Sequence, residues 1–201
     1  MESENKKPEL IIIAGPNGSG KTTVTQTLLK HEWGQDALYI NPDDVAQQKF
    51  GDWNSNDAVI KAAQFCQELR YQSIEKQINI VFETVMSSQE KIDYIHYAKE
   101  KGYFIRLFFV CTDAPEINAA RIAKRYMDGG HCVPIEKIVS RYYKALNNLN
   151  IIFKEVDRCY FYDNSVNNEM AKILFRTENG RLAKQYVNTI PDWAKPVFSQ
   201  L

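Results

Sequence analysis

The chain has 201 residues, enough for one domain with a buried core, and no Pro-, Gly- or Ser-rich linker divides it. Lys plus Arg and Asp plus Glu both number 25, so no net field favours nucleic acid or an anionic membrane as a partner. Four widely spaced cysteines, a polar N-terminus and the lack of a long apolar run predict a single cytoplasmic domain over residues 1–201 that does not span a membrane.

The first predicted strand, Leu10 to Ala14, leads into a segment that fits the phosphate-binding pattern G-x-x-x-x-G-K-S/T. Glycines let successive backbone N–H groups turn around a phosphate, Lys21 supplies a point charge, and the Thr22 hydroxyl can hold Mg²⁺. Thr22 and Thr23 would open a helix whose dipole adds to the anion site. We predict that the nucleotide contacts Gly15, Pro16, Asn17, Gly18, Ser19, Gly20, Lys21, Thr22 and Thr23. A nucleoside triphosphate site is therefore the first hypothesis.

Further apolar runs predict the other strands of the sheet. Five runs are expected in all: Leu10 to Ala14, Ala37 to Asn41, Ile78 to Thr84, Tyr103 to Thr112 and Cys159 to Asp163. The runs are continuous rather than alternating, which is typical of strands covered on both faces, and helical stretches lie between them. This pattern predicts an α/β fold with a mostly parallel sheet. Ligands of such sheets sit beyond the carboxyl ends of the strands, so polar residues there are candidates for the site.

Carboxylates follow the second strand and close the third. Asp43 could orient and deprotonate an acceptor hydroxyl beside a γ-phosphate, and Asp44 could bind the acceptor. An alternative is that one or both cap a short helix from Val45 to Lys49. Glu83 could reach Mg²⁺, the acceptor or a water, or be only a solvated carboxylate at a strand end.

A cationic helix face follows Pro115. Arg121, Lys124 and Arg125 lie at i, i+3 and i+4, just before Gly129 and Gly130, and this arrangement predicts a helical lid whose arginines close over the transferring phosphoryl group. A solvated charged face is the alternative. His131 and Arg141 are further candidates for phosphate or substrate contacts, although an isolated histidine is more often structural.

The last part of the chain predicts a hairpin. Asn179 and Gly180 form a turn signal between the strand-like runs Ile173 to Thr177 and Arg181 to Val187. The closing segment Ile190 to Trp193 would strap an aromatic ring onto the body. We expect a core over residues about 9–165 and a hairpin with tail over about 166–201, with a structural or partner-facing role.

Together these motifs resemble the zeta-toxin-like kinases. The resemblance is carried, in order, by residues 15–22, 41–44, 82–84, 129–134 with 141–142, and 163–165. It implies a P-loop NTPase fold, three-layer α/β/α with a five-stranded, mostly parallel sheet, and a phosphotransferase that uses ATP and Mg²⁺. It also implies UDP-N-acetylglucosamine as an acceptor, phosphorylated on a sugar hydroxyl, and leaves room for an inhibitory antitoxin protein as a partner.

The resemblance implies roles for individual residues. Lys21 would hold the β- and γ-phosphates, Thr22 the metal, and Asp43 would be the catalytic base. Glu83 matches the substrate-binding glutamate and Arg125 one of two lid arginines. Asn164 falls in a loop that the family places near the adenine.

The sequence departs from the family where the sugar would bind. Val85 and Ser87 stand where the toxins carry a threonine and an arginine, and His131 lies near the place of the second lid arginine. A kinase for another small molecule therefore stays open, with its acceptor pocket around Val85, Met86, Ser87 and Trp53. An ATP-dependent switch protein and a kinase of RNA or DNA ends are further alternatives, the last disfavoured by the neutral charge.

Overall fold

Seven strands form one sheet in the computed structural model of the chain, which describes residues 7–51, 55–129 and 133–201. The strands are β1 (Glu9–Ala14), β2 (Leu38–Ile40), β3 (Ile80–Thr84), β4 (Phe104–Cys111), β5 (Arg158–Asp163), β6 (Lys172–Glu178) and β7 (Arg181–Gln185). Their order across the sheet is β2-β3-β1-β4-β5-β6-β7. The first five strands in the chain are parallel, while β6 and β7 are antiparallel. The predicted, mostly parallel sheet is confirmed.

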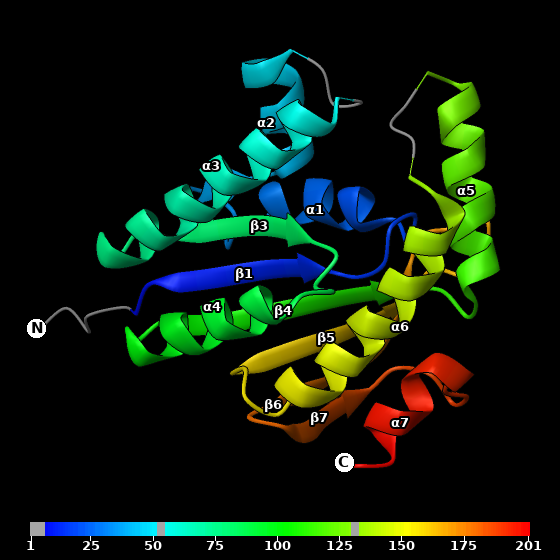
Figure 1. Cartoon of the computed structure of the whole chain (residues 1–201). Coiled ribbons are helices and arrows are strands. Elements are labelled where there is room, and N and C mark those ends of the chain that lie inside the picture. The colour runs from blue at the N-terminus through cyan, green and yellow to red at the C-terminus, as the bar shows by residue number, and fades with distance from the viewer. Residues whose placement is uncertain (1–6, 52–54, 130–132) are drawn as a thin grey trace, which may run out of the picture.

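Helices cover both faces of this sheet. They are α1 (Lys21–Leu29), α2 (Pro42–Phe50), α3 (Asn56–Glu75), α4 (Gln89–Glu100), α5 (Pro115–Met127), α6 (Ile135–Ile152), the 3₁₀ turn η1 (Asp192–Ala194) and α7 (Lys195–Phe198). Leu28 of α1 packs with Ile11 and Ile13 on one face. Helices α3, α4, α6 and α7 pack on the other face with Ile12, and Figure 1 shows α4 and α6 in front of the sheet. The α/β/α layering is thus confirmed. No helix in the described ranges is long and apolar enough to cross a bilayer.

The expected number of five strands in the sheet was wrong. The C-terminal hairpin does form, but β6 pairs with β5 and continues the sheet instead of standing beside it. The rings of Phe161 and Phe175 stack across this junction with centroids 4.2 Å apart. Both side chains are fully buried, so the hairpin extends the core and removes β5 from the sheet edge.

The carboxyl ends of the parallel strands define the functional edge. Helix α1 leaves β1 over one face, while α4 carries the chain from β3 past β1 to β4 over the other. The connections therefore diverge between β1 and β3, where doubly wound sheets bind ligands. The Gly15 N–H donates to the carbonyl of Thr84 at 3.2 Å and ties the two strand ends together. Residues 15–22 and Glu83 therefore meet at this switch point.

Candidate active site

The phosphate-binding loop has the backbone shape that its glycines permit. Gly15 has φ 146° and Gly20 has φ 92°, a region that residues with a Cβ rarely adopt. A Cβ on Gly15 would collide with the carbonyl oxygen of Val110, and one on Gly20 with Nδ2 of Asn164. Gly20 is also the N-cap of α1 and offers no side-chain cap. The first N–H groups of α1 are therefore left to face an anion.

Lys21 lies inside this loop. Its Nζ donates to the carbonyl oxygens of Gly15 and Pro16, each at 2.9 Å. Burial lowers the pKa of Lys21 to about 8, partly offset by the negative charges of Glu83 and Asp43. Ser19 is fully buried, and its Oγ has no hydrogen-bond partner within the described part of the chain. A half-buried lysine whose amine is held by loop carbonyls and an unpaired hydroxyl suit a loop that closes around phosphate.

Glu83 is held by two polar side chains at the end of β3. Its Oε1 accepts a hydrogen bond from the Tyr39 hydroxyl at 2.9 Å, and its Oε2 accepts from Thr22 Oγ1 at 3.4 Å. Asn41 Nδ2 in turn donates to the Tyr39 hydroxyl oxygen at 3.1 Å. Glu83 is 8% exposed, so the alternative of a solvated carboxylate at a strand end was wrong.

The Thr22 and Glu83 pair fits Mg²⁺. Both groups offer oxygen atoms, the ligands that Mg²⁺ prefers, and they meet where α1 begins beside the phosphate loop. Within residues 7–51, 55–129 and 133–201, no cluster of three or more His, Cys, Asp or Glu side chains could hold a metal alone. Mg²⁺ bound to a nucleotide needs only one or two protein ligands, because phosphates and waters complete its shell.

Asp43 and Asp44 lie in the first turn of α2 and do not cap it. Asn41 is the N-cap, and its Oδ1 accepts a hydrogen bond from the Asp43 N–H at 3.0 Å. The alternative capping role was therefore wrong, because the helix begins at Pro42, earlier than its apolar pattern indicates. Asp43 is exposed, whereas Asp44 is half-buried. Burial, together with the charges of Glu83 and Asp43, raises the pKa of Asp44.

The structure separates the predicted arginines. Arg125 lines the pocket that Gly18 and Gly20 of the phosphate loop also line. Arg141 Nη1 donates to Asn17 Oδ1 at 3.5 Å and also reaches this loop. Arg121 instead holds the segment after β5, with Nε donating to Asn167 Oδ1 at 2.9 Å and Nη2 to the Val166 carbonyl at 3.4 Å. Its predicted contact with the γ-phosphate stays a prediction.

A pocket of about 530 Å³ opens between the phosphate loop, α5 and the segment after β5. Its walls include Gly18, Gly20, Arg121, Arg125, Asn164 and Asn167. Asn164 Nδ2 donates to the Ser19 carbonyl at 2.8 Å, so one side chain joins the pocket wall to the phosphate loop. The predicted adenine-side residue thus lies beside the phosphate site, within a nucleotide's reach.

Two residues of the site were missed from the sequence. Asn118 on α5 is fully buried, and its Nδ2 donates to the Asn17 carbonyl at 2.6 Å, while the Thr112 hydroxyl donates to its Oδ1. Tyr39 holds Glu83 as described above. Only the position of Tyr39 near the end of a strand could have indicated a role, and Asn118 sits in a helix with no local signal.

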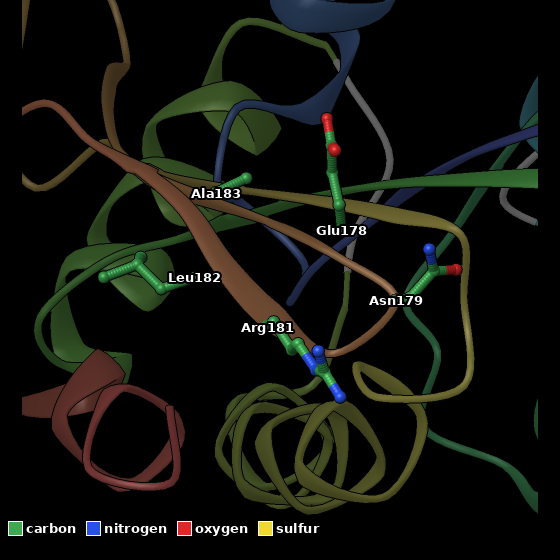
Figure 2. Close-up of a pocket in the computed structure, with 5 residues that line it drawn as sticks. All are labelled: Glu178, Asn179, Arg181, Leu182 and Ala183. Carbon is green, nitrogen blue, oxygen red and sulfur yellow. The ribbon is translucent and has the colours of Figure 1, made fainter.

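Four residues of the sequence analysis lie outside the described ranges: Trp53, Gly130, His131 and Cys132. The predicted contact of His131 with substrate therefore stays a prediction. A different hollow lies at the hairpin turn and is lined by Glu178, Asn179, Arg181, Leu182 and Ala183 (Figure 2). The register of β5 and β6 pairs Glu178 with Arg158, at the amino end of β5, so this hollow lies at the opposite sheet edge from the phosphate loop.

Comparison with known proteins decides the family. The model of the family described as "Zeta toxin" matches residues 1–173. The chain belongs to the zeta toxin family. A protein of Haemophilus influenzae, described as uncharacterized, is 31% identical to it over 134 residues, which are 66% of this chain and 91% of that protein.

Solved structures share the fold of this zeta toxin family member. A structure from the PezAT chromosomal toxin-antitoxin system of Streptococcus pneumoniae superposes with a TM-score of 0.67 at 17% identity, covering 97% of this chain and 80% of that one. The AvrRxo1-ORF1:-ORF2 complex with ATP gives a TM-score of 0.63 at 18% identity, covering 90% and 62%. Family membership and the phosphate site make the chain an ATP-dependent phosphotransferase of the P-loop class.

Proposed function

We propose that this enzyme transfers the γ-phosphoryl group of ATP to a hydroxyl group of a small molecule, with a UDP-N-acetyl sugar as the first candidate acceptor. One observation carries the proposal: Glu83 accepts a hydrogen bond from Thr22, the neighbour of Lys21, at 3.4 Å, and is linked through the Tyr39 hydroxyl to Asn41, the cap of the helix that bears Asp43. A carboxylate able to activate a hydroxyl therefore lies beside the group that would hold the phosphates.

The reaction is an in-line displacement. Asp43 accepts the proton of the acceptor hydroxyl, whose oxygen forms a bond to the γ-phosphorus. The bond between that phosphorus and the β–γ bridging oxygen breaks, and ADP leaves with the bonding electron pair. Asp43 suits this task because it is exposed at the first turn of α2, while its backbone N–H is fixed by Asn41. Asp44 and Glu83 would bind the acceptor next to it.

Positive charge would stabilise the transferring group. Lys21 lies in the phosphate loop, Arg125 lines the pocket beside Gly20, and Arg141 reaches the loop through Asn17. These side chains would face the phosphate oxygens, where charge develops in the transition state. Mg²⁺ held by Thr22, with Glu83 beside it, would neutralise charge on the phosphates when bound. Positioning and charge would supply most of the catalysis.

The acceptor is the open part of the proposal. Val85, Met86 and Ser87 follow Glu83, and Met86 is fully buried with φ 57°, fixed by its N–H bond to Thr84 Oγ1 at 3.0 Å. The side chains of Val85 and Ser87 beside this tight turn are half-buried. Neither supplies the positive charge that an arginine would. Another nucleotide sugar, a nucleoside or an antibiotic would suit such a wall as well.

The proposal includes a partner and a place of action. The PezAT structure comes from a toxin-antitoxin system, which supports an inhibitory antitoxin as a partner of this chain. Cys66, Cys111 and Cys159 are free and buried, as expected of a cytoplasmic protein that draws on ATP.

Mass spectrometry of reactions with Mg·ATP tests the function. The reactions would contain a panel of UDP-sugars, nucleosides and aminoglycosides, with wild type beside Asp43→Asn. The matched control is Asp57→Asn, an exposed aspartate in the first turn of α3 that pairs only with Lys61 at 2.7 Å among the described residues. We expect one acceptor to gain the mass of one phosphate with wild type and Asp57→Asn, but not with Asp43→Asn.

Other outcomes would change the assignment. ADP formation with no phosphorylated acceptor would favour a switch protein over a kinase. Phosphate gain by a compound other than a UDP-sugar would keep the kinase and remove the sugar. Full activity in Asp43→Asn would remove Asp43 as the base, and Asp44→Asn would then be the next variant.

A further inference from the structure

The C-terminal tail is bound to the end of β5 that adjoins the nucleotide pocket. Trp193 in η1 is 6% exposed, and its indole Nε1 donates to Asp163 Oδ1 at 2.9 Å. Asp163 is the last residue of β5. The tail lies beyond residues 1–173, the part that matches the family model. The contact therefore joins a residue beyond the matched region to one within it.

Asp163 organises the segment that follows it. Its Oδ1 also accepts a hydrogen bond from Ser165 Oγ at 2.7 Å, and its Oδ2 accepts from the Ser165 N–H at 3.2 Å. Ser165 Oγ accepts in turn from the Asp113 N–H at 2.8 Å. The carboxylate thus closes a turn around one residue, Asn164, and Trp193 bonds to the same carboxylate oxygen as the Ser165 hydroxyl.

Asn164 connects this turn to the phosphate loop through hydrogen bonds. Its backbone N–H donates to the Cys111 carbonyl at 2.8 Å, and its side-chain Nδ2 donates to the Ser19 carbonyl at 2.8 Å. The fit against Gly20 is close, because even a methyl group there would collide with Nδ2. A shift of the turn would therefore move Asn164 relative to the loop that holds the phosphates.

We propose that Trp193 is a positioning residue for nucleotide binding, acting from the tail through Asp163 and Asn164 on the phosphate loop. The inference rests on the proposed function only in taking ATP as the ligand of that loop. The Trp193 ring also packs near Phe109, with centroids 6.0 Å apart, so a purely structural role must be separated from a positioning one.

Trp193→Phe removes the indole N–H and keeps a smaller aromatic ring near Phe109, and the melting temperature of the variant reports how much packing is lost. ATP affinity would be measured by calorimetry without an acceptor, using the full chain. We expect about fivefold or more weaker binding, the usual scale of coupling between sites, and little change of turnover at saturating ATP. The control is Phe198→Leu, which alters the same tail at its contact with Phe175 and leaves the Asp163 bond intact.

A double variant tests the route. Asn164→Ala should also weaken ATP binding, and Trp193→Phe added to it should have no further effect, because the link is already cut. Wild-type affinity in Trp193→Phe, additive losses in the double variant, or an equal loss in Phe198→Leu at equal melting temperature would each overturn the inference. Lys21→Ala keeps the two proposals apart: unchanged ATP affinity in that variant would remove the nucleotide site itself.

Discussion

The hydroxyl of Tyr39 on β2 donates a hydrogen bond to Glu83 Oε1 on the neighbouring strand β3 at 2.9 Å. The same hydroxyl oxygen accepts from Asn41, the residue that caps the helix bearing Asp43. One short chain of hydrogen bonds therefore links the carboxylate beside Thr22 with the helix that carries the proposed base. The two halves of the site, phosphate loop and acceptor side, share this link.

Removing that hydroxyl should lower turnover. In Tyr39→Phe, Glu83 loses one of its donors and Asn41 loses its acceptor, so the carboxylate and the start of α2 are less well fixed. We expect kcat to fall about tenfold, equivalent to about 1.4 kcal/mol of barrier, with ATP affinity little changed. Steady-state measurement of ADP release gives kcat, and calorimetry without an acceptor gives the ATP affinity.

Tyr103→Phe is the matched control for this change. The Tyr103 hydroxyl donates to the carbonyls of Ser73 and Ile78 at 3.1 and 2.8 Å, away from the carboxyl edge of the sheet. Its loss should cost about 1 kcal/mol of unfolding free energy and leave kcat unchanged. Equal losses of kcat in the two variants would mean that Tyr39→Phe acts by destabilising the protein and not through the site.

Gly15→Ala should disable the phosphate loop. The added methyl group meets the Val110 carbonyl oxygen, and the backbone must also hold φ 146°. We expect a loss of about 3 kcal/mol in the free energy of unfolding, and no measurable ATP binding. Gly102→Ala separates the two causes, because Gly102 has φ 84° but no atom within 4 Å of its added methyl group. That control should lose about 1 kcal/mol and bind ATP normally.

Substituting one asparagine on each side of the site should change the KM for one substrate at a time. Asn118→Ala removes the hydrogen bond to the Asn17 carbonyl and should raise the KM for ATP. Asn148→Ala removes the bond to the Met86 carbonyl at 2.9 Å, which supports the turn after Glu83, and should raise the KM for the acceptor only. Initial rates with each substrate varied would show the contrast. A rise in both constants in both variants would contradict it.

The sequence predicts the strands and the phosphate loop well because their signals are local. Continuous apolar runs locate the five parallel strands, and the glycine pattern locates Lys21. The polar residues after the strands meet at one edge, as a parallel sheet requires.

Contacts between distant segments were not predictable in this way. The Tyr39–Glu83 bond depends on the register of β2 and β3, in which Tyr39 lies opposite Val81. Arg121 and Arg125 share a helix face in sequence and line one pocket, yet only the bond from Arg121 to Asn167 fixes the segment after β5. Turn chemistry indicated the hairpin, whereas its joining to the sheet depends on the packing of Phe175 against Phe161.

ATP binding should depend on pH through Lys21. Burial lowers the pKa of this amine from the ordinary value of 10.5 to about 8 in the nucleotide-free protein. Above that pH the loop loses the positive charge that holds phosphate, so binding must bring a proton back. The titration of Lys21 should therefore leave ATP affinity constant below pH 8. Above pH 8 it should weaken ATP affinity by up to about tenfold per pH unit.

The stability of the folded protein depends on pH in the opposite direction from ATP affinity. Between pH 8 and 10.5 the unfolded chain binds more protons at this site than the folded protein does, so the contribution of Lys21 to stability rises with pH in that window. Calorimetry in two buffers of different ionisation enthalpy would measure proton uptake on ATP binding, expected near pH 9 and absent near pH 7. Lys21→Ala should bind weakly with no such uptake. Equal proton uptake at both pH values, or uptake that persists in Lys21→Ala, would assign the titration to another group.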